Sequence, residues 1–162
     1  MYNFIQKPNA YNPELWLSLI GHNCYMYALN YTGNEPTFWP GEFSGFNLAE
    51  FNKTGYCPID ELRQRIFCDC KNIGLEIRES TLYEETTNDE WKIALLEKWI
   101  PEDTDYDFHF LRQDFPNSWS SKFIGELPSN LDDDFNIITN PQNAEFWLYK
   151  FITCFILKKV SH

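Results

Sequence analysis

The chain has 162 residues, 43% of them apolar and 18% aromatic, which is enough for one soluble domain with a substantial core over residues 1–162. Its formal charge of −11, from 24 acidic and 13 basic residues, excludes the Lys/Arg stripe with which nucleic-acid-binding proteins contact phosphates. The longest apolar run, residues 151–157, is far too short to span a bilayer.

The cysteines and the N-terminal residues indicate a reducing compartment. Five cysteines, an odd number, do not form a disulfide framework in a chain of this length. Residues 1–16 have neither the basic start nor the apolar stretch of a secretory signal. We therefore expect a cytoplasmic protein, and export by a dedicated secretion system, as for a bacterial effector, stays open.

Neither a metal nor another cofactor is expected. Cys68 and Cys70 are two residues apart, so on a helix they would point in nearly opposite directions. The sequence has no Cys-x-x-Cys or His-x-x-His spacing and no Gly-rich phosphate loop.

Acidic residues cluster at residues 84–85, 102–107 and 132–134. A solvated surface that keeps the protein in solution is the simpler interpretation of these clusters. A docking site for a cationic partner is the alternative.

The first two helices are predicted near the N-terminus. The triplet at residues 12–14 combines a capping side chain, Pro at the first helical position and an acid in the first turn, and Gly21 follows as a stop. Asn23 is expected to cap a second helix that begins at Cys24 and ends near residues 32–34 after about two turns.

A long segment and a longer helix follow. Residues 32–57 are punctuated by Pro and Gly and rich in aromatic residues, a composition typical of an ordered loop that walls a binding cleft. The clearest helix spans residues 58–73, because apolar residues recur on one of its faces and Gly74 occupies the C-terminal cap.

The second half of the chain is predicted to form strands. They are expected at residues 75–78, 92–96, 107–112 and 119–123, with a final strand or strand pair in residues 146–157. The short apolar stretch 92–96 is typical of a central strand. Helices followed by antiparallel strands predict an α+β fold with the N-terminal helices packed on the sheet. Core positions are expected for Trp39, Trp91, Trp99, Trp119 and Trp147.

Cys24 is the candidate nucleophile. A thiol attacks as the thiolate, and the unpaired N–H groups at the start of a helix lower its pKa. The predicted helix start places the Cys24 sulfur in the first turn. The alternative is that Cys24 is buried as a small apolar residue, as cysteines commonly are.

His109 is the candidate base, because a strand would hold its ring rigidly. Alternation along that strand puts His109 on the face opposite to Phe108 and Phe110. The other two histidines are weaker candidates, since His22 is expected in a surface loop and His162 at a frayed terminus.

Three segments resemble small bacterial proteins of the papain-like superfamily: residues 23–30 (NCYMYALN) with Pro40-Gly41, residues 107–114 (DFHFLRQD) with 119–122 (WSSK), and residues 136–144 (NIITNPQNA). The resemblance implies a cysteine nucleophile on a helix packed against an antiparallel sheet. It also implies a base histidine on one strand and a polar orienting residue on the next, as in papain-like peptidases and NlpC-type amidases.

By position in these segments, Cys24 and His109 take the first two roles. The third falls to Ser121, where the resembled sequences carry a histidine. A hydroxyl can accept the imidazole N–H but cannot offset the charge of an imidazolium, so Asp134 is an alternative orienting residue. The backbone N–H of Cys24, with the Asn23 side chain, would stabilise the oxyanion.

The sequence thus favours a thiol hydrolase, a cysteine peptidase or amidase acting on a peptide or protein substrate through an acyl-enzyme. Deamidation or amide transfer on a glutamine side chain at the same site is one alternative. A non-catalytic, acidic protein-interaction module is the other, and the high charge, the small size and the missing third residue favour it. The sequence makes no prediction of oligomeric state.

Overall fold

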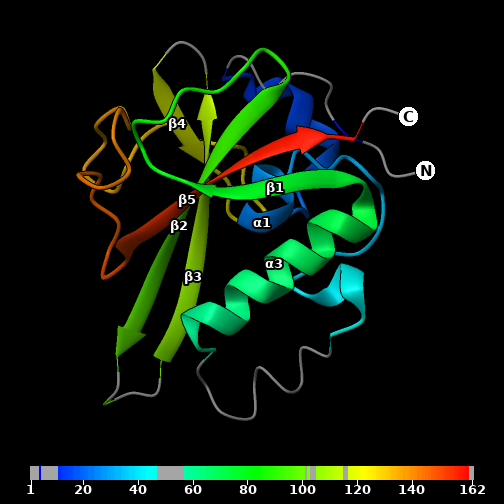
Figure 1. Ribbon diagram of the computed structural model, residues 1–162. Helices are drawn as coiled ribbons and strands as arrows, with labels where there is room; N and C mark the ends of the chain where they lie inside the picture. Colours follow the sequence, from blue (N-terminus) through cyan, green and yellow to red (C-terminus); the bar gives the residue numbers. More distant parts are fainter. Residues whose placement is uncertain are drawn as a thin grey trace.

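The computed structural model describes residues 4, 11–46, 57–100, 102, 105–114 and 117–160. The fold is α+β, with helices packed on a five-stranded antiparallel sheet in the order β1-β5-β2-β3-β4 (Figure 1). The strands are β1 (Leu75–Ser80), β2 (Glu90–Ile100), β3 (Asp105–Asp114), β4 (Ser118–Ser121) and β5 (Lys150–Lys159). The general α+β prediction is therefore confirmed, and residues 92–96 lie in the central strand β2 as expected.

The two N-terminal helices are shorter or tighter than predicted. The first is the 3-10 helix η1 (Pro13–Leu19), and Asn12 makes no side-chain capping bond. The second, α1 (Cys24–Ala28), begins where predicted, because the side-chain Oδ1 of Asn23 accepts the backbone N–H of Met26 at 2.9 Å. It ends early, at Ala28, and Asn30 shortly after it has a φ of 56°, in the left-handed region that stops a helix.

The long helix α3 (Ile59–Ile73) matches its prediction. Its buried residues include Leu62, Ile66, Cys70 and Ile73, which face the sheet. Gly74 ends the helix at a φ of 84°, a conformation that glycine adopts without strain.

The segment predicted to wall a cleft folds onto the core where it is described. It contains the short 3-10 helix η2 (Glu42–Ser44), and Phe38 stacks on Phe43 with 4.2 Å between ring centroids. Both rings pack against the helix-covered core. Residues 47–56 of this segment, like Pro116 and His162, lie outside the described residues.

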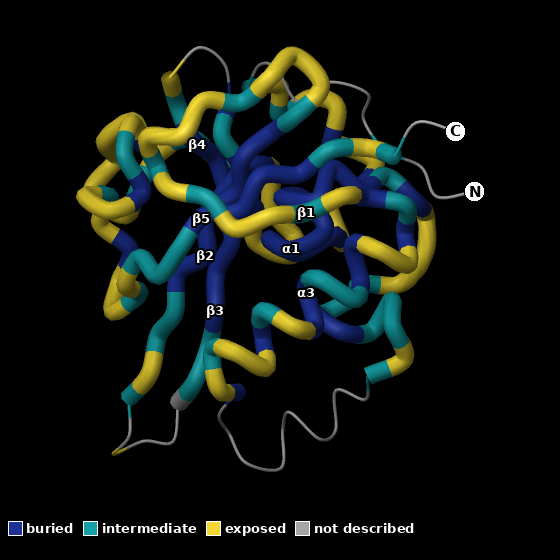
Figure 2. The backbone as a smooth tube through the Cα atoms, viewed as in Figure 1, coloured by how far each residue is buried: buried dark blue, intermediate teal, exposed yellow. Residues whose placement is uncertain are grey.

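The sheet separates two apolar clusters. The side covered by α1 and α3, called here the helix face, is buried around Trp91, Ile93 and Leu95 of β2 and the aromatic residues of β3. The opposite side, called the loop face, is covered by the irregular segment 123–149, which is orange in Figure 1 and largely exposed in Figure 2. Its cluster consists of Ala94, Leu96, Leu111, Trp119, Ile138, Phe146 and Cys154.

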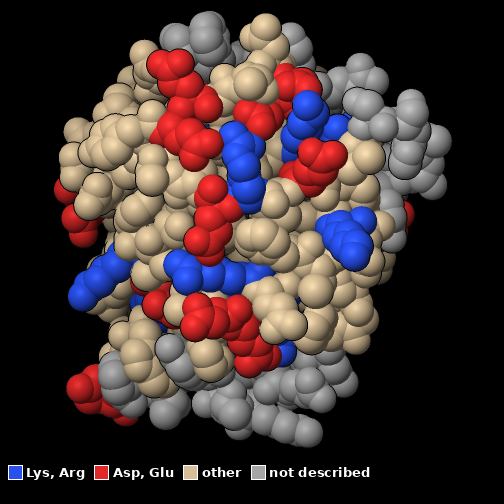
Figure 3. All heavy atoms as spheres, in the orientation of Figure 1, with Lys and Arg blue, Asp and Glu red and all other residues tan. Residues whose placement is uncertain are grey.

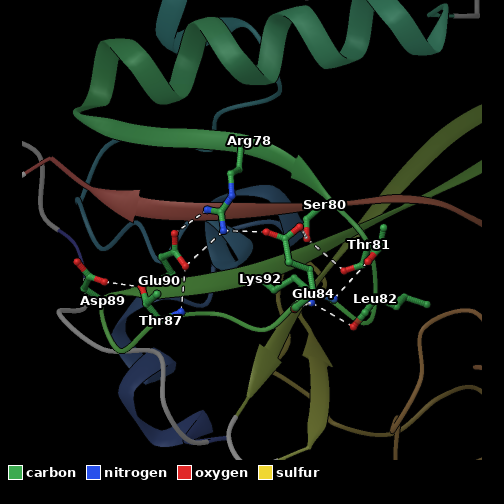
Figure 4. Close-up of polar contacts among 9 residues, drawn as sticks. All are labelled: Arg78, Ser80, Thr81, Leu82, Glu84, Thr87, Asp89, Glu90 and Lys92. Carbon is green, nitrogen blue, oxygen red and sulfur yellow. Dashed lines mark hydrogen bonds and ion pairs between the residues drawn. The ribbon is translucent and has the colours of Figure 1, made fainter.

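A second loop, residues 81–89, is fastened over the loop face by a buried lysine (Figure 4). Lys92 alternates with Trp91 and Ile93, so it points away from the helices, and its ammonium donates to the carbonyls of Leu82 and Glu84. Burial lowers the pKa of Lys92. The buried cation is thus hydrogen-bonded, as a group of this kind must be.

Three core and surface predictions were wrong. His22 is 5% exposed rather than on the surface, because the Lys122 ammonium donates to its carbonyl at 2.6 Å and to that of Ile20 at 2.8 Å. These bonds hold the turn against the sheet. Trp99 and Trp147 are exposed rather than buried, since Trp99 lies at the end of β2 and Trp147 lies in the segment 123–149.

Within the described ranges, no helix combines the length and apolar character needed to cross a bilayer.

Candidate functional site

Cys24 lies at the first residue of α1, where the sequence places it, but its thiol is sealed in the helix-face core. The residue is 7% exposed. Burial raises the pKa of the Cys24 thiol to about 12, despite a hydrogen bond from the backbone of Phe110. The thiol is therefore un-ionised at pH 7. The helix start therefore does not activate this cysteine, because its desolvation outweighs the favourable N–H groups.

His109 lies on β3, as predicted, and is packed among aromatic rings. Its imidazole stacks on Phe123 with 4.5 Å between centroids and contacts Phe146 and Tyr149 at 5.6 and 5.8 Å. Burial lowers the pKa of His109 to about 4, so the ring is neutral at pH 7. Among the described residues, its Nε2 finds no hydrogen-bond partner.

The two candidate groups point to opposite faces of the sheet. Phe108 and Phe110 belong to the cluster that contains Cys24. His109 lies between them on a regular strand, so its side chain projects to the loop face, where its ring contacts lie. Proton transfer from the Cys24 thiol to His109 would require the ring to cross the sheet. The catalytic pair stays a prediction, and this arrangement does not assemble it.

Ser121 lies on β4, the strand next to β3, and pairs with Leu111. Its neighbour Ser120 bonds Tyr27 on the helix face, so Ser121 faces the loop face, as His109 does. The two residues thus lie on adjoining, antiparallel strands. No contact between the hydroxyl and the imidazole supports an orienting role, which stays a prediction.

Asn23 makes hydrogen bonds that stabilise the fold, and Asp134 lies on the surface. The side-chain Oδ1 of Asn23 caps α1, and the side-chain Nδ2 donates to the carbonyl of Phe38 at 2.7 Å. These bonds fix the start of α1 against the following segment, and an oxyanion role stays a prediction. Asp134 is exposed in the segment 123–149, whereas His109 is buried and its ring contacts are Phe123, Phe146 and Tyr149.

The sequence motifs that suggested catalysis also build a buried polar network, which the sequence analysis did not anticipate. Arg112 donates to Asn30 at 2.6 Å and to Asp114 at 2.9 Å, and its guanidinium lies 4.2 Å from the Tyr27 ring centroid. Ser120 donates to Asp114 and bonds the Tyr27 hydroxyl. The network joins α1 to β3 and β4 on the helix face.

Lys122, the last residue of the WSSK segment, completes this arrangement. Its ammonium donates to three carbonyls, those of Ile20, His22 and Phe123. Burial lowers its pKa to about 8. Lys122 thus fixes the turn that leads into α1. No signal in the sequence pointed to this role, because Lys122 follows the short, largely polar strand β4 and its three acceptors are backbone carbonyls.

A different part of the molecule presents exposed aromatic side chains. Phe135 is 83% exposed and Trp147 is 70% exposed. Both lie in residues 131–148, called here the 131–148 loop, together with exposed Leu131, Ile137 and Leu148. The acidic residues 132–134 of this loop stand out in the sequence as a cluster, whereas its exposed apolar residues follow no pattern there.

Metal ligation finds no support in the described ranges, which contain no group of three or more His, Cys, Asp or Glu residues able to hold an ion. All five cysteines are free thiols. Cys68 is partly exposed on α3, whereas the other four are buried.

Comparisons of the chain with protein-family models, curated proteins and solved structures found no match in any of the three. The papain-like resemblance therefore rests on the sequence segments alone.

Proposed function

We propose that this chain is a protein-interaction module that works without catalysis. The observation that carries the proposal is the separation of its reactive groups. Cys24 is a buried thiol with a raised pKa on the helix face, and His109 is a buried neutral ring on the loop face. Five large apolar side chains within residues 131–148 are meanwhile exposed, and a group of this kind is a candidate binding surface.

Site-resolved alkylation tests the absence of catalysis. Native protein is treated with iodoacetamide at neutral pH, and each cysteine is quantified by mass spectrometry. We expect Cys68, which is partly exposed, to react first, and Cys24 to react at least about 100-fold more slowly because only the thiolate attacks. Denaturant should make all five react alike. Alkylation of native Cys24 at the rate of Cys68 or faster would contradict the proposal.

Reconstitution with a purified partner tests the binding function. The complex should form at fixed stoichiometry and survive Cys24→Ala and His109→Phe without loss of affinity. The mass of the bound partner should stay unchanged. A partner that is cleaved, or gains the mass of a deamidation, only when Cys24 is present would establish an enzyme instead.

A thiol hydrolase with a papain-like layout is the second candidate. It is supported by the packing of α1, which begins at Cys24, on the sheet whose strands β3 and β4 carry His109 and Ser121. Peptide hydrolysis, glutamine deamidation and amide transfer would all need the Cys24 thiol and the His109 ring to come into contact. Alkylation of native Cys24 would favour all three over the interaction module, and the products would separate them.

A further inference from the structure

We propose that the 131–148 loop is a preformed docking surface for a protein segment that carries apolar side chains bordered by Lys or Arg. This inference rests on the proposed function and names its surface and the chemistry of its partner. Three features of the loop carry it: exposed aromatic side chains, a fixed backbone and an uncompensated negative charge.

The exposed apolar side chains are large and lie on one hydrogen-bonded structure. Leu131 and Ile137 form a bridge between the two arms of the turn around Phe135. The N–H of Trp147 donates to the Asp133 carboxylate at 2.8 Å, which ties the second part of the loop to the first. Aromatic side chains, Trp above all, are among those that most often dominate protein binding energy.

Hydrogen bonds within the loop fix its backbone. One oxygen of the Asp132 carboxylate accepts the N–H groups of Asp134 and Asn136 at 3.1 and 2.9 Å, and the other accepts that of Glu145 at 3.1 Å. The backbone of Asp133 adds a bond to the Glu145 carbonyl at 2.9 Å. A surface held in this way loses little conformational entropy on binding.

Two bulky residues of the loop have strained backbones. Phe135 and Leu148 have φ values of 63° and 64°, in the left-handed region that non-glycine residues avoid. Both are exposed. Core packing therefore does not explain why these positions are apolar and not glycine, whereas presentation of the side chains to a partner does.

The loop carries negative charge and contains no basic residue, although Lys122 and Lys150 flank the segment 123–149. Residues 123–149 contain five acids, at positions 126, 132, 133, 134 and 145, and no Lys or Arg. Elsewhere acids and bases are interleaved, as Figure 3 shows across the middle of the visible face, and they form ion pairs such as Arg78–Glu90 and Lys158–Asp89. None of the ion pairs found between described residues includes an acid of the loop.

Charge complementarity selects the occupant. Apolar side chains alone would suit a second copy of this chain or a lipid surface. A second copy would bring the same carboxylates together, and the copies would repel at a net charge of −11 each. Anionic lipid is disfavoured for the same reason. A cationic, amphipathic protein segment satisfies both the exposed aromatic residues and the carboxylates around them.

The test uses a synthetic peptide that places Leu on one face of a helix and Lys on the other. Isotope-labelled protein is titrated with the peptide and followed by amide chemical shifts. We expect shifts concentrated in residues 131–148, and affinity that falls between about 0.05 and 0.5 M salt because the charges are exposed. The same peptide with Glu in place of Lys should not bind.

Matched variants locate the surface. Trp147→Ala combined with Phe135→Ala should weaken peptide binding about 10-fold or more, since these are the two most exposed large apolar side chains of the loop. The backbone N–H of Trp147 still bonds Asp133 in this variant. Tyr83→Ala is the control, because Tyr83 is 82% exposed in another loop, and it should leave the affinity unchanged.

Several results would overturn the inference. They are absence of peptide binding, shifts that map outside the loop, an equal loss in Tyr83→Ala, a concentration-dependent dimer that needs Trp147, or stronger binding to phosphatidylcholine vesicles than to the peptide. The proposed function fails separately. If Trp147→Ala leaves the affinity of a reconstituted complex unchanged, the docking surface is refuted but the interaction module is not. If the partner is chemically altered only when Cys24 is present, the interaction module is refuted.

Discussion

The helix face and the loop face of the sheet both bury polar side chains, but the hydrogen bonding of those side chains differs. On the helix face, the Asp69 carboxylate accepts bonds from Tyr25, Gly41 and Ser44, and Asp114 binds Arg112. On the loop face, His109 is buried with an unpartnered nitrogen. The strained residues of the 131–148 loop lie on that side as well. The helix face also contains an unpartnered nitrogen, on the Asn30 side chain, but its carbonyl oxygen accepts a bond from Arg112, whereas the His109 ring is packed among aromatic rings.

The largest loss of stability is expected when Asp114, on the helix face, is replaced. In Asp114→Ala the buried Arg112 guanidinium loses its carboxylate, and Ser120 loses its acceptor. Removal of one partner from a buried ion pair costs about 3–5 kcal/mol, so the free energy of unfolding in urea should fall by that amount. Asp114→Asn keeps an acceptor oxygen and should lose less. A fall below about 1 kcal/mol in Asp114→Ala would show that the network is not what joins α1 to the strands.

The loop face should respond to pH through His109. Its pKa is about 4 in the folded chain and about 6.5 when the chain is unfolded, so between these values the unfolded state binds a proton that the folded state does not. Above pH 6.5 the free energy of unfolding is not lowered by His109. It falls as the pH drops toward 4, by an amount of order 3 kcal/mol in total.

His109→Phe isolates this contribution, because other groups titrate in the same range. Urea unfolding of both proteins from pH 7 to pH 4 should give a difference that grows as the pH falls. The variant should match or exceed the parent at pH 7, since a ring of similar shape removes the unpartnered nitrogen. Parallel pH profiles for the two proteins would mean that His109 is not buried as a neutral ring.

Much of the fold was predictable because local signals were strong. The apolar period of α3 and its terminal Gly74 gave the helix bounds almost to the residue. Alternation in β3 correctly put His109 opposite to Phe108 and Phe110. The 3-10 form of η1 was not predictable from its start and stop signals, which α- and 3-10 helices share.

The candidate site was harder to predict, because a motif does not give the face of the sheet to which its helix docks. Alternation assigned His109 to one face of its strand, but nothing in the sequence said that α1 covers the other. The burial of Cys24 likewise depends on contacts with distant residues such as Phe110. The exposure of Trp147 depends on bonds within an irregular loop, for which the sequence has no periodic signal.

Relief of backbone strain in the 131–148 loop should raise the free energy of unfolding, by less than the Asp114 and His109 changes lower it. Phe135→Gly removes a side chain from a left-handed backbone position, whereas Phe135→Ala keeps the strain of a Cβ atom. The glycine variant should be more stable than the alanine variant by about 1 kcal/mol in urea unfolding, while both lose peptide affinity. The same pair at Phe123, which is not among the positive-φ residues, should show no gain for glycine. Equal stability of the two Phe135 variants would contradict the strain.

The smallest loss of stability is expected for the surface ion pairs of Arg78, which join β1 to β2 and to the 81–89 loop. Arg78 bonds Glu90 at 2.6 Å and Glu84 at 2.9 Å, but its side chain is 46% exposed (Figure 4). Exposed pairs of this kind contribute about 0.2–1 kcal/mol, so Arg78→Ala should lower the unfolding free energy by that amount at low salt and by less at 0.5 M salt, given a Debye length of about 4 Å there.

The contrast with Lys92 sharpens this prediction. Lys92→Ala removes a buried cation from two carbonyls that then lack their donor, so its loss should exceed that of Arg78→Ala and should not fade with salt. If the Arg78 variant loses as much as the Lys92 variant, the interleaved charges outside the 131–148 loop contribute more than their exposure implies. The lack of basic residues in that loop would then cost the fold measurable stability, which would strengthen the case that a partner supplies the missing positive charge.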